Sequence, residues 1–218
     1  MPNWCSTTFV FHGDGEELET LYKFIDHAID QNRTDNTISD FKAAWLGNVL
    51  LDLEIDKEDV CHSNDPHYRC RGWIEDMALD KIGNDIYELR LYTETAWDVM
   101  DEMWELVLEK LDLKSVKFSF CAEEEDCGYY VKHNIEGYND FPETYRLDAY
   151  IEKEIDGKMY QGELVEPYCG SESEIVDELN KFFGTEHSKL EDFYDLIDEF
   201  NNENEDDQWI YVNKFVEV

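Results

Sequence analysis

Basic residues are scarce in this chain: 18 Lys and Arg stand against 54 Asp and Glu among 218 residues, which gives a formal net charge of −36 at pH 7. Proteins that bind nucleic acids need clustered Lys and Arg to displace counterions from the phosphate backbone. We therefore expect neither direct nucleic-acid binding nor attraction to an anionic membrane surface. The charge predicts basic protein partners instead.

Long apolar runs are also missing, since none approaches the about 18 residues that a membrane span needs. The opening Met1-Pro2-Asn3-Trp4 has no basic leader region, so we expect a cytoplasmic protein. In that compartment the cysteines are expected to be reduced thiols. Disorder is not expected, because the apolar fraction is 42%, the aromatic fraction is 14% and only 4 residues are proline.

The common catalytic motifs are absent as well. The sequence has no G-x-S-x-G, no P-loop, no H-E-x-x-H and no dinucleotide-binding fingerprint. A calcium loop of the EF-hand type is missing too, because the acidic run Asn204-Glu205-Asp206-Asp207 has no glycine for the sharp turn. The sequence therefore predicts a non-catalytic protein without a cofactor.

One segment holds four possible zinc ligands within ten residues: Cys61, His62, His67 and Cys70. Their spacing matches no common zinc motif, and two adjacent side chains such as Cys61 and His62 do not easily bind one ion. A small zinc protein or enzyme built on these residues remains an alternative, weaker than the non-catalytic prediction.

The hydrophobic pattern predicts an α+β fold. Apolar periodicity and turn signals indicate elements in the order strand, helix, strand, strand, helix, strand. The strands lie at about residues 5–12, 70–80, 85–94 and 116–121. The first helix is opened by Asp14 and Glu17, and the second is capped by Thr95 and runs to about residue 112. This order is that of the ferredoxin-like βαββαβ fold, an antiparallel sheet with helices on one face and with its first and fourth strands adjacent.

The predicted organisation has two parts. Residues 1–136 form the ferredoxin-like domain with an insertion at about 32–69, and residues 137–218 form an acidic α+β extension packed on it. The extension holds two expected helices, 171–183 and 188–200, each opened by a Ser-x-x-Glu capping box at Ser171/Glu174 and Ser188/Glu191. Further strands are expected at 129–132, 145–152 and 208–218.

The six tryptophans would suit a nucleic-acid-binding protein, because some ferredoxin-like sheets stack RNA bases on aromatic side chains. Those sheets carry basic residues among the aromatics, whereas this chain is acidic throughout. We therefore expect the tryptophans to pack in the core.

Several short stretches carry a family resemblance. They are Met1-Pro2-Asn3-Trp4-Cys5-Ser6-Thr7-Thr8, Trp45-Leu46-Gly47, Cys70-Arg71-Gly72, Thr93-Glu94-Thr95-Ala96-Trp97, Glu123-Glu124-Glu125-Asp126-Cys127-Gly128 and Phe141-Pro142-Glu143-Thr144-Tyr145. Together they resemble the YubB-type ferredoxin-like family of small proteins carried by phages, plasmids and conjugative elements of bacteria. The resemblance reaches to about residue 150. It implies a mobile-element origin in a bacterial host cell and a ferredoxin-like core, and it brings no established catalytic residues.

The acids are densest after residue 137, where 23 acids and 6 bases give a net charge of −17. On a helix from Ser188 the acids would follow one another at about one charge per 2.7 Å of axis, close to the ~3.4 Å spacing along one DNA strand. The net charge of −36 equals that of about 60 Å of duplex. This pattern predicts a surface that mimics nucleic acid.

The sequence therefore predicts an inhibitor that occupies the basic channel of a nucleic-acid-binding defence protein, such as a CRISPR effector or a restriction enzyme. The alternative is a protein-interaction module of a phage or conjugative element that has no inhibitory role. The residues expected to face the partner are Asp98, Asp101, Glu102, Glu105, Glu109, Glu123, Glu124, Glu125, Asp126, Glu191, Asp192, Asp195, Asp198, Glu199, Glu203, Glu205, Asp206 and Asp207.

Overall fold

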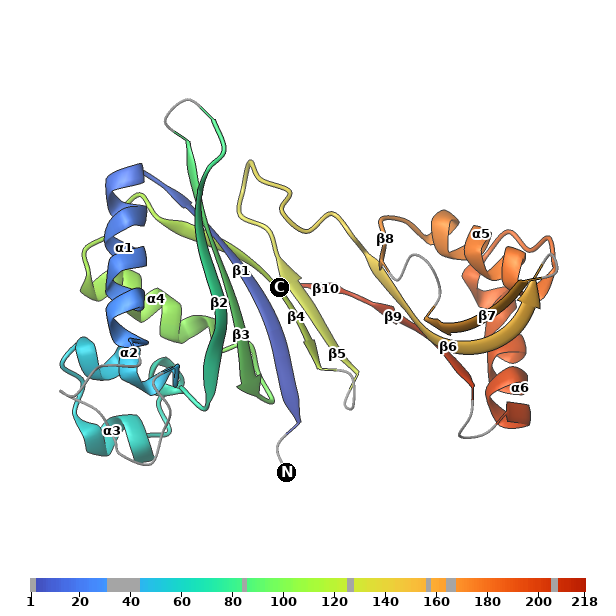
Figure 1. The fold of residues 1–218 in the computed structure, drawn as a ribbon, viewed down its shortest axis with the longest axis horizontal. Coiled ribbons are helices and arrows are strands. Elements are labelled where there is room, and N and C mark those ends of the chain that lie inside the picture. The colour runs from blue at the N-terminus through green and yellow to red at the C-terminus, as the bar shows by residue number, and fades with distance from the viewer. Residues whose placement is uncertain are drawn as a thin grey trace. The chain divides into compact units, whose positions relative to one another are not determined.

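The computed structural model describes residues 3–30, 44–83, 86–124, 128–155, 158–163, 168–204 and 208–218, with the side chains of 151–163 excepted. The chain divides into two compact units, Met1–Phe141 and Pro142–Val218, and each is described by itself (Figure 1). The predicted boundary at 136/137 lies five residues before this division. Within the described ranges, no helix is both long and apolar enough to cross a membrane.

Unit 1 combines an antiparallel sheet with helices on one face (Figure 1). Its strands pair in the order β5-β4-β1-β3-β2, so the expected adjacency of the first and fourth strands is confirmed. The elements are β1 Trp4–Gly13, α1 Gly15–Ala28, α2 Gly47–Asp52, α3 Lys57–His62, the 3-10 turn η1 Pro66–Tyr68, β2 Gly72–Lys81, β3 Tyr87–Ala96, α4 Asp101–Lys110, β4 Lys117–Glu124 and β5 Tyr129–His133. The α+β class is confirmed.

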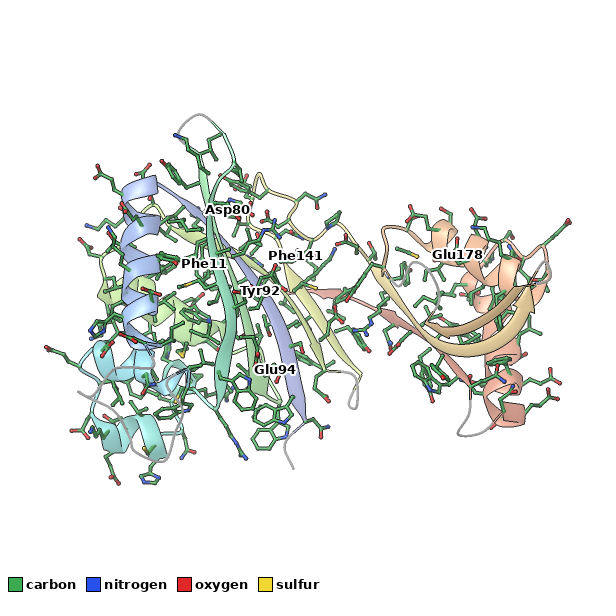
Figure 2. The ribbon with its side chains drawn as sticks, viewed as in Figure 1. Phe11, Asp80, Tyr92, Glu94, Phe141 and Glu178 are labelled. Carbon is green, nitrogen blue, oxygen red and sulfur yellow. The ribbon has the colours of Figure 1, made fainter. Side chains whose placement is uncertain are left out.

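Strand alternation sorts the side chains of β1 onto two faces. Phe9 and Phe11 are buried on the helix-covered face, where each ring centroid lies 5.9 Å from that of Trp104 in α4. Phe11 lies between α1 and the sheet in Figure 2. The side chains of Val10 and His12 belong to the opposite face. That second face carries the polar residues discussed below.

The tryptophans have mixed roles. Trp104 and Trp45 are buried, at 1% and 8% exposure, as expected for core residues. Trp4 and Trp97 are 37% and 54% exposed, so the expectation of core packing is wrong for both. Trp4 instead lies against Trp73, with ring centroids 4.4 Å apart.

Glycine is required where β2 begins beside β3. A Cβ atom on Gly72 would lie 2.2 Å from the carbonyl oxygen of Glu94 and 2.8 Å from Cα of Thr95. Gly72 therefore lets the two strands approach closely at the start of their pairing.

In unit 1 the helix start predicted at Thr95 is wrong, whereas the start predicted at Asp14 is confirmed without its capping bond. Thr95 is not a cap, because β3 continues through Ala96 and Thr95 pairs in register with Cys5. The chain then passes through Trp97 and Met100 in the left-handed region, at φ 69° and 60°, and α4 begins at Asp101. Asp14 does precede α1, but its side chain makes no capping hydrogen bond. The expected insertion at about 32–69 contains α2 and α3, and residues 31–43 lie outside the described ranges.

Unit 2 packs a second antiparallel sheet against helices. Strand β6 pairs with β7, β8 and β9. The elements are β6 Tyr145–Ile155, β7 Lys158–Glu163, β8 Tyr168–Cys169, α5 Glu172–Phe183, the 3-10 turn η2 Leu190–Phe193, α6 Tyr194–Asn204, β9 Trp209–Lys214 and β10 Val216–Glu217. Its own core includes Leu147, Ile175, Leu179, Phe193 and Ile210.

Of the two capping boxes predicted in unit 2, one is confirmed. The Ser171 hydroxyl accepts the backbone N–H of Glu174 at 3.4 Å and opens α5. The box at Ser188/Glu191 is wrong, because the chain there forms η2 after Lys189, without a side-chain cap. The burial of Leu190 and Phe193, three residues apart, favours this tighter turn before α6.

Candidate functional site

The described part of α6 presents a stripe of four exposed acids. Asp195, Asp198, Glu199 and Glu203 stand at positions i, i+3, i+4 and i+8, which place them on one side of the helix. Ile197 is buried on the opposite side. At about 1.5 Å rise per residue the nine residues of the stripe cover about 13.5 Å, or one charge per ~3.4 Å. This is wider than the 2.7 Å expected from sequence, because Glu191 and Asp192 lie in η2, and still close to phosphate spacing along one strand.

Few cations balance this stripe. The segment Leu190–Asn204 contains no Lys or Arg, and residues 142–218 hold 22 acids against 6 bases. Among the described residues, no ion pair involves any of the four acids of the stripe. Asp192 in η2 lies 4.0 Å from Nδ1 of His187. Within the described part of the chain, the α6 stripe therefore presents negative charge without an ion-pair partner.

A second stripe lies on α4 in unit 1. Asp101, Glu102, Glu105 and Glu109 also span nine residues on one side of their helix, with Glu105 and Glu109 exposed and the other two half-buried. Partial burial, together with the neighbouring Glu102 and Asp98, raises the pKa of Asp101 from 3.8 to about 6. The raised pKa reports first the partial burial of Asp101 and then the negative charges beside it at the start of α4.

This raised pKa predicts that Asp101→Asn stabilises the protein in a pH-dependent way. Ionised Asp101 is disfavoured in the folded state, so its cost is absent below about pH 3.8 and complete above about pH 6. Allowing for the half-exposed site, we expect a gain of about 1 kcal/mol at pH 8 and a smaller gain at pH 5. Urea unfolding at both pH values measures it. Equal gains at both, or a similar gain from Glu105→Gln, would contradict this explanation.

Other residues predicted to face a partner are placed elsewhere. The prediction that Glu124 faces a partner is wrong, because β4 extends through this residue and leaves it 2% exposed. Asp98 is paired with Arg69 at 2.8 Å and accepts the Tyr129 hydroxyl at 3.3 Å, so its charge is compensated. Glu123 is half-buried on β4. Glu125, Asp126, Glu205, Asp206 and Asp207 lie outside the described residues.

Three of the four residues considered as zinc ligands border a cleft, and the four do not meet at one point. Cys61, His62 and Cys70 border a cleft of about 890 Å³ together with Arg69, Arg71 and Trp97, whereas His67 is not part of its wall. The Cys70 thiol donates to the Val60 carbonyl, and burial raises its pKa to about 12. No three of the four candidates bring ligand atoms within 4.8 Å of one another.

A different metal-type group does assemble in the described ranges. His12, Glu88 and Asp140 each offer a ligand atom within 4.8 Å of the other two, and it is the only such group of three found there. Sequence reasoning missed it, because His12 and Asp140 are 128 residues apart. The available signal was the alternation of β1, which places a histidine on the face opposite Phe9 and Phe11.

Comparisons with models of protein families, with curated proteins and with solved structures find no match to this chain. The YubB-type resemblance therefore stays a prediction. The proposed function rests on the geometry of the chain's own residues.

Proposed function

We propose that this chain is a non-catalytic inhibitor that binds a basic, nucleic-acid-binding defence protein by imitating the phosphate charge of nucleic acid. The observation that carries the proposal is the α6 stripe, whose four exposed acids follow one another at near-phosphate spacing without a basic neighbour in the segment. The α4 stripe offers a second surface of the same kind. A mobile-element origin, a bacterial cytoplasmic location and a ferredoxin-like core for unit 1 belong to the same proposal.

The physical basis is electrostatic. A nucleic-acid channel lined with Lys and Arg holds condensed anions in solution, and an acidic protein that enters the channel releases them. The electrostatic attraction between a strongly acidic protein and a basic channel also speeds their association, and this gain in rate falls as the ionic strength rises. The supporting feature in this chain is that the acids lie on helices, so little backbone ordering is needed on binding.

An aromatic side chain next to the α6 stripe supplies the apolar contact that most tight interfaces contain. Tyr194 is the first residue of α6, directly precedes Asp195 in the chain and is 52% exposed. Tyrosine is enriched among residues that dominate binding energy, because it combines a large apolar area with a hydroxyl group. Tyr194 is therefore the anchor that we assign to this surface.

A DNA-cleavage assay tests the proposal. Purified CRISPR effectors and restriction endonucleases are each assayed on duplex DNA with increasing amounts of this protein. We expect stoichiometric loss of cleavage for at least one class of enzyme and no DNA cleavage by this protein alone. Binding to such enzymes without any loss of cleavage would instead support the alternative, an interaction module of a mobile element without an inhibitory role.

A further inference from the structure

A buried polar group lies on the sheet face opposite the helices of unit 1. His12 in β1 pairs in register with Glu88 in β3, so both side chains belong to this face. Tyr92 and Glu94 of β3 also lie on this face (Figure 2). The loop after β5 supplies the third member, Asp140. The group therefore joins two strands and one loop of a single unit.

The loop that carries Asp140 is fixed to the sheet at its end. The Asn134 side chain accepts the backbone N–H of Phe141 at 3.0 Å and donates to its carbonyl at 3.2 Å. The Lys132 ammonium donates to the same carbonyl at 3.0 Å. Because Phe141 directly follows Asp140, these bonds hold the carboxylate in place.

The three side chains are almost completely withdrawn from solvent. His12 is 4% exposed, Glu88 is 8% exposed and the side chain of Asp140 is 10% exposed. Nε2 of His12 lies 3.0 Å from both carboxylate oxygens of Asp140. Buried carboxylates need compensating positive charge, and Arg90 supplies one charge through its ion pair with Glu88 at 2.6 Å, which leaves Asp140 with the neutral imidazole as its ring partner.

One atom of this group is left without a partner in the described structure. Nδ1 of His12 is buried and forms no hydrogen bond. Nε2 is the ring nitrogen that faces Asp140, so an ion shared with that carboxylate binds Nε2 in place of the hydrogen bond, and Nδ1 then carries the hydrogen of the neutral ring. Neutral imidazole is the commonest metal ligand among side chains, and the Nε2 edge of the ring is the edge that meets the Asp140 carboxylate.

Each carboxylate is also oriented by a second group, as in protein metal sites. Arg90 donates from Nε to Glu88 at 2.6 Å. The Ser119 hydroxyl donates to Asp140 at 2.5 Å, and the same hydroxyl accepts the backbone N–H of Ile135 at 3.2 Å. Tyr138 stacks on the His12 ring with centroids 3.9 Å apart. These contacts fix the ring and both carboxylates before any ion binds.

We propose that His12, Glu88 and Asp140 bind one divalent transition-metal ion of the zinc class. An imidazole nitrogen with two carboxylates is a donor set that suits Zn²⁺ better than Mg²⁺ or Ca²⁺, which prefer oxygen donors alone. The ion would neutralise the buried carboxylates and fix the Asn134–Phe141 loop to the sheet. This site is independent of the acidic stripes and of the inhibitor proposal.

Calorimetric titration of metal-stripped protein with ZnCl2 tests the proposal. About 150 mM NaCl and millimolar MgCl2 screen or occupy the weak sites that so many surface acids create. We expect one Zn²⁺ per chain, bound at micromolar concentration or tighter. Titration with Co²⁺ should give the absorption bands of a site with few ligands and a nitrogen donor. Absence of any saturable site at one ion per chain would overturn the proposal.

Matched variants locate the ion. His12→Gln and Glu88→Gln should each weaken Zn²⁺ binding at least 100-fold. His27→Gln is the control, because His27 also pairs with an aspartate, Asp52 at 3.1 Å, but is 64% exposed. Cys61→Ser tests the zinc candidates of the cleft and should leave binding unchanged.

The loss of a buried side chain can disturb the fold, so circular dichroism accompanies each variant. Should His12→Gln not fold, the NMR signals of the wild-type histidine rings decide: Zn²⁺ should shift those of His12 and leave those of His27 in place. Tight binding that survives in a folded His12→Gln variant, or shifts confined to other histidines, would contradict the assignment.

Discussion

Reversing the four acids of the α6 stripe is expected to weaken binding to the inhibited enzyme about 100-fold. Each reversal replaces an attraction to a partner Lys or Arg by a repulsion, and exposed charge pairs contribute about 0.2–1 kcal/mol each. Four reversals therefore remove about 3 kcal/mol, which is about two factors of ten. The substitutions are Asp195→Lys, Asp198→Lys, Glu199→Lys and Glu203→Lys, and inhibition of DNA cleavage at fixed protein concentration should disappear with them.

A matched control separates local complementarity from total charge. Reversing four exposed acids of the α1 region changes the net charge by the same amount on unit 1. These acids are Glu16, Glu19, Asp26 and Asp30. We expect this variant to keep most of its affinity, within about threefold. Equal losses in both variants would mean that only the total charge matters, and an unchanged affinity of the α6 variant would exclude this surface.

Trp104→Ala is expected to destabilise the protein by about 3–5 kcal/mol, because it opens a cavity where α4 meets the sheet. The side chain is 1% exposed and packs against Phe9 and Phe11. It also holds the α4 acids in position, although it carries no charge itself. Urea unfolding monitored by circular dichroism gives the free energy of unfolding.

Trp97→Ala provides the matched comparison, since the same side chain is removed from a site that is 54% exposed. The Trp97 ring lies 4.8 Å from the Arg71 guanidinium, a contact that is small in energy when exposed. We expect a loss below about 1 kcal/mol. Comparable losses in the two variants would contradict the position of Trp104 in the core.

Much of unit 1 was predictable from local pattern. The strand expected at about 85–94 is confirmed as β3, in which Glu88 and Arg90 alternate with the buried Leu89 and Leu91. The order of strands and helices predicted which strands pair, because split βαβ connections leave few arrangements. In unit 2 the Ser171/Glu174 box predicted the start of α5 correctly, since the cap depends on neighbours in sequence alone.

Predictions failed where tertiary pairing overrides a local signal. Thr95 has the chemistry of a helix cap, but pairing with β1 keeps it in β3. Glu124 belongs to an acidic run that suggests exposure, yet strand pairing extends to it and buries it. Charge alone does not reveal where a strand ends.

The His12 group was beyond sequence reasoning for a different reason. Its members come from two strands and a loop, and their meeting depends on the register of His12 with Glu88 and on the path of the loop that carries Asp140. The acids of α6, by contrast, are neighbours along one helix, so their stripe follows from spacing once the helix start is known. The helix start predicted at Ser188 lies at Tyr194 in the structure.

The salt dependence of binding tests the central claim most directly. The affinity between this protein and the enzyme it inhibits is measured from about 50 to 500 mM NaCl, with and without competing duplex DNA. Mimicry predicts an affinity that falls at least tenfold across this range and a protein that DNA displaces from the same site. An affinity that stays flat with salt, or a ternary complex in which DNA and this protein bind together, would contradict it.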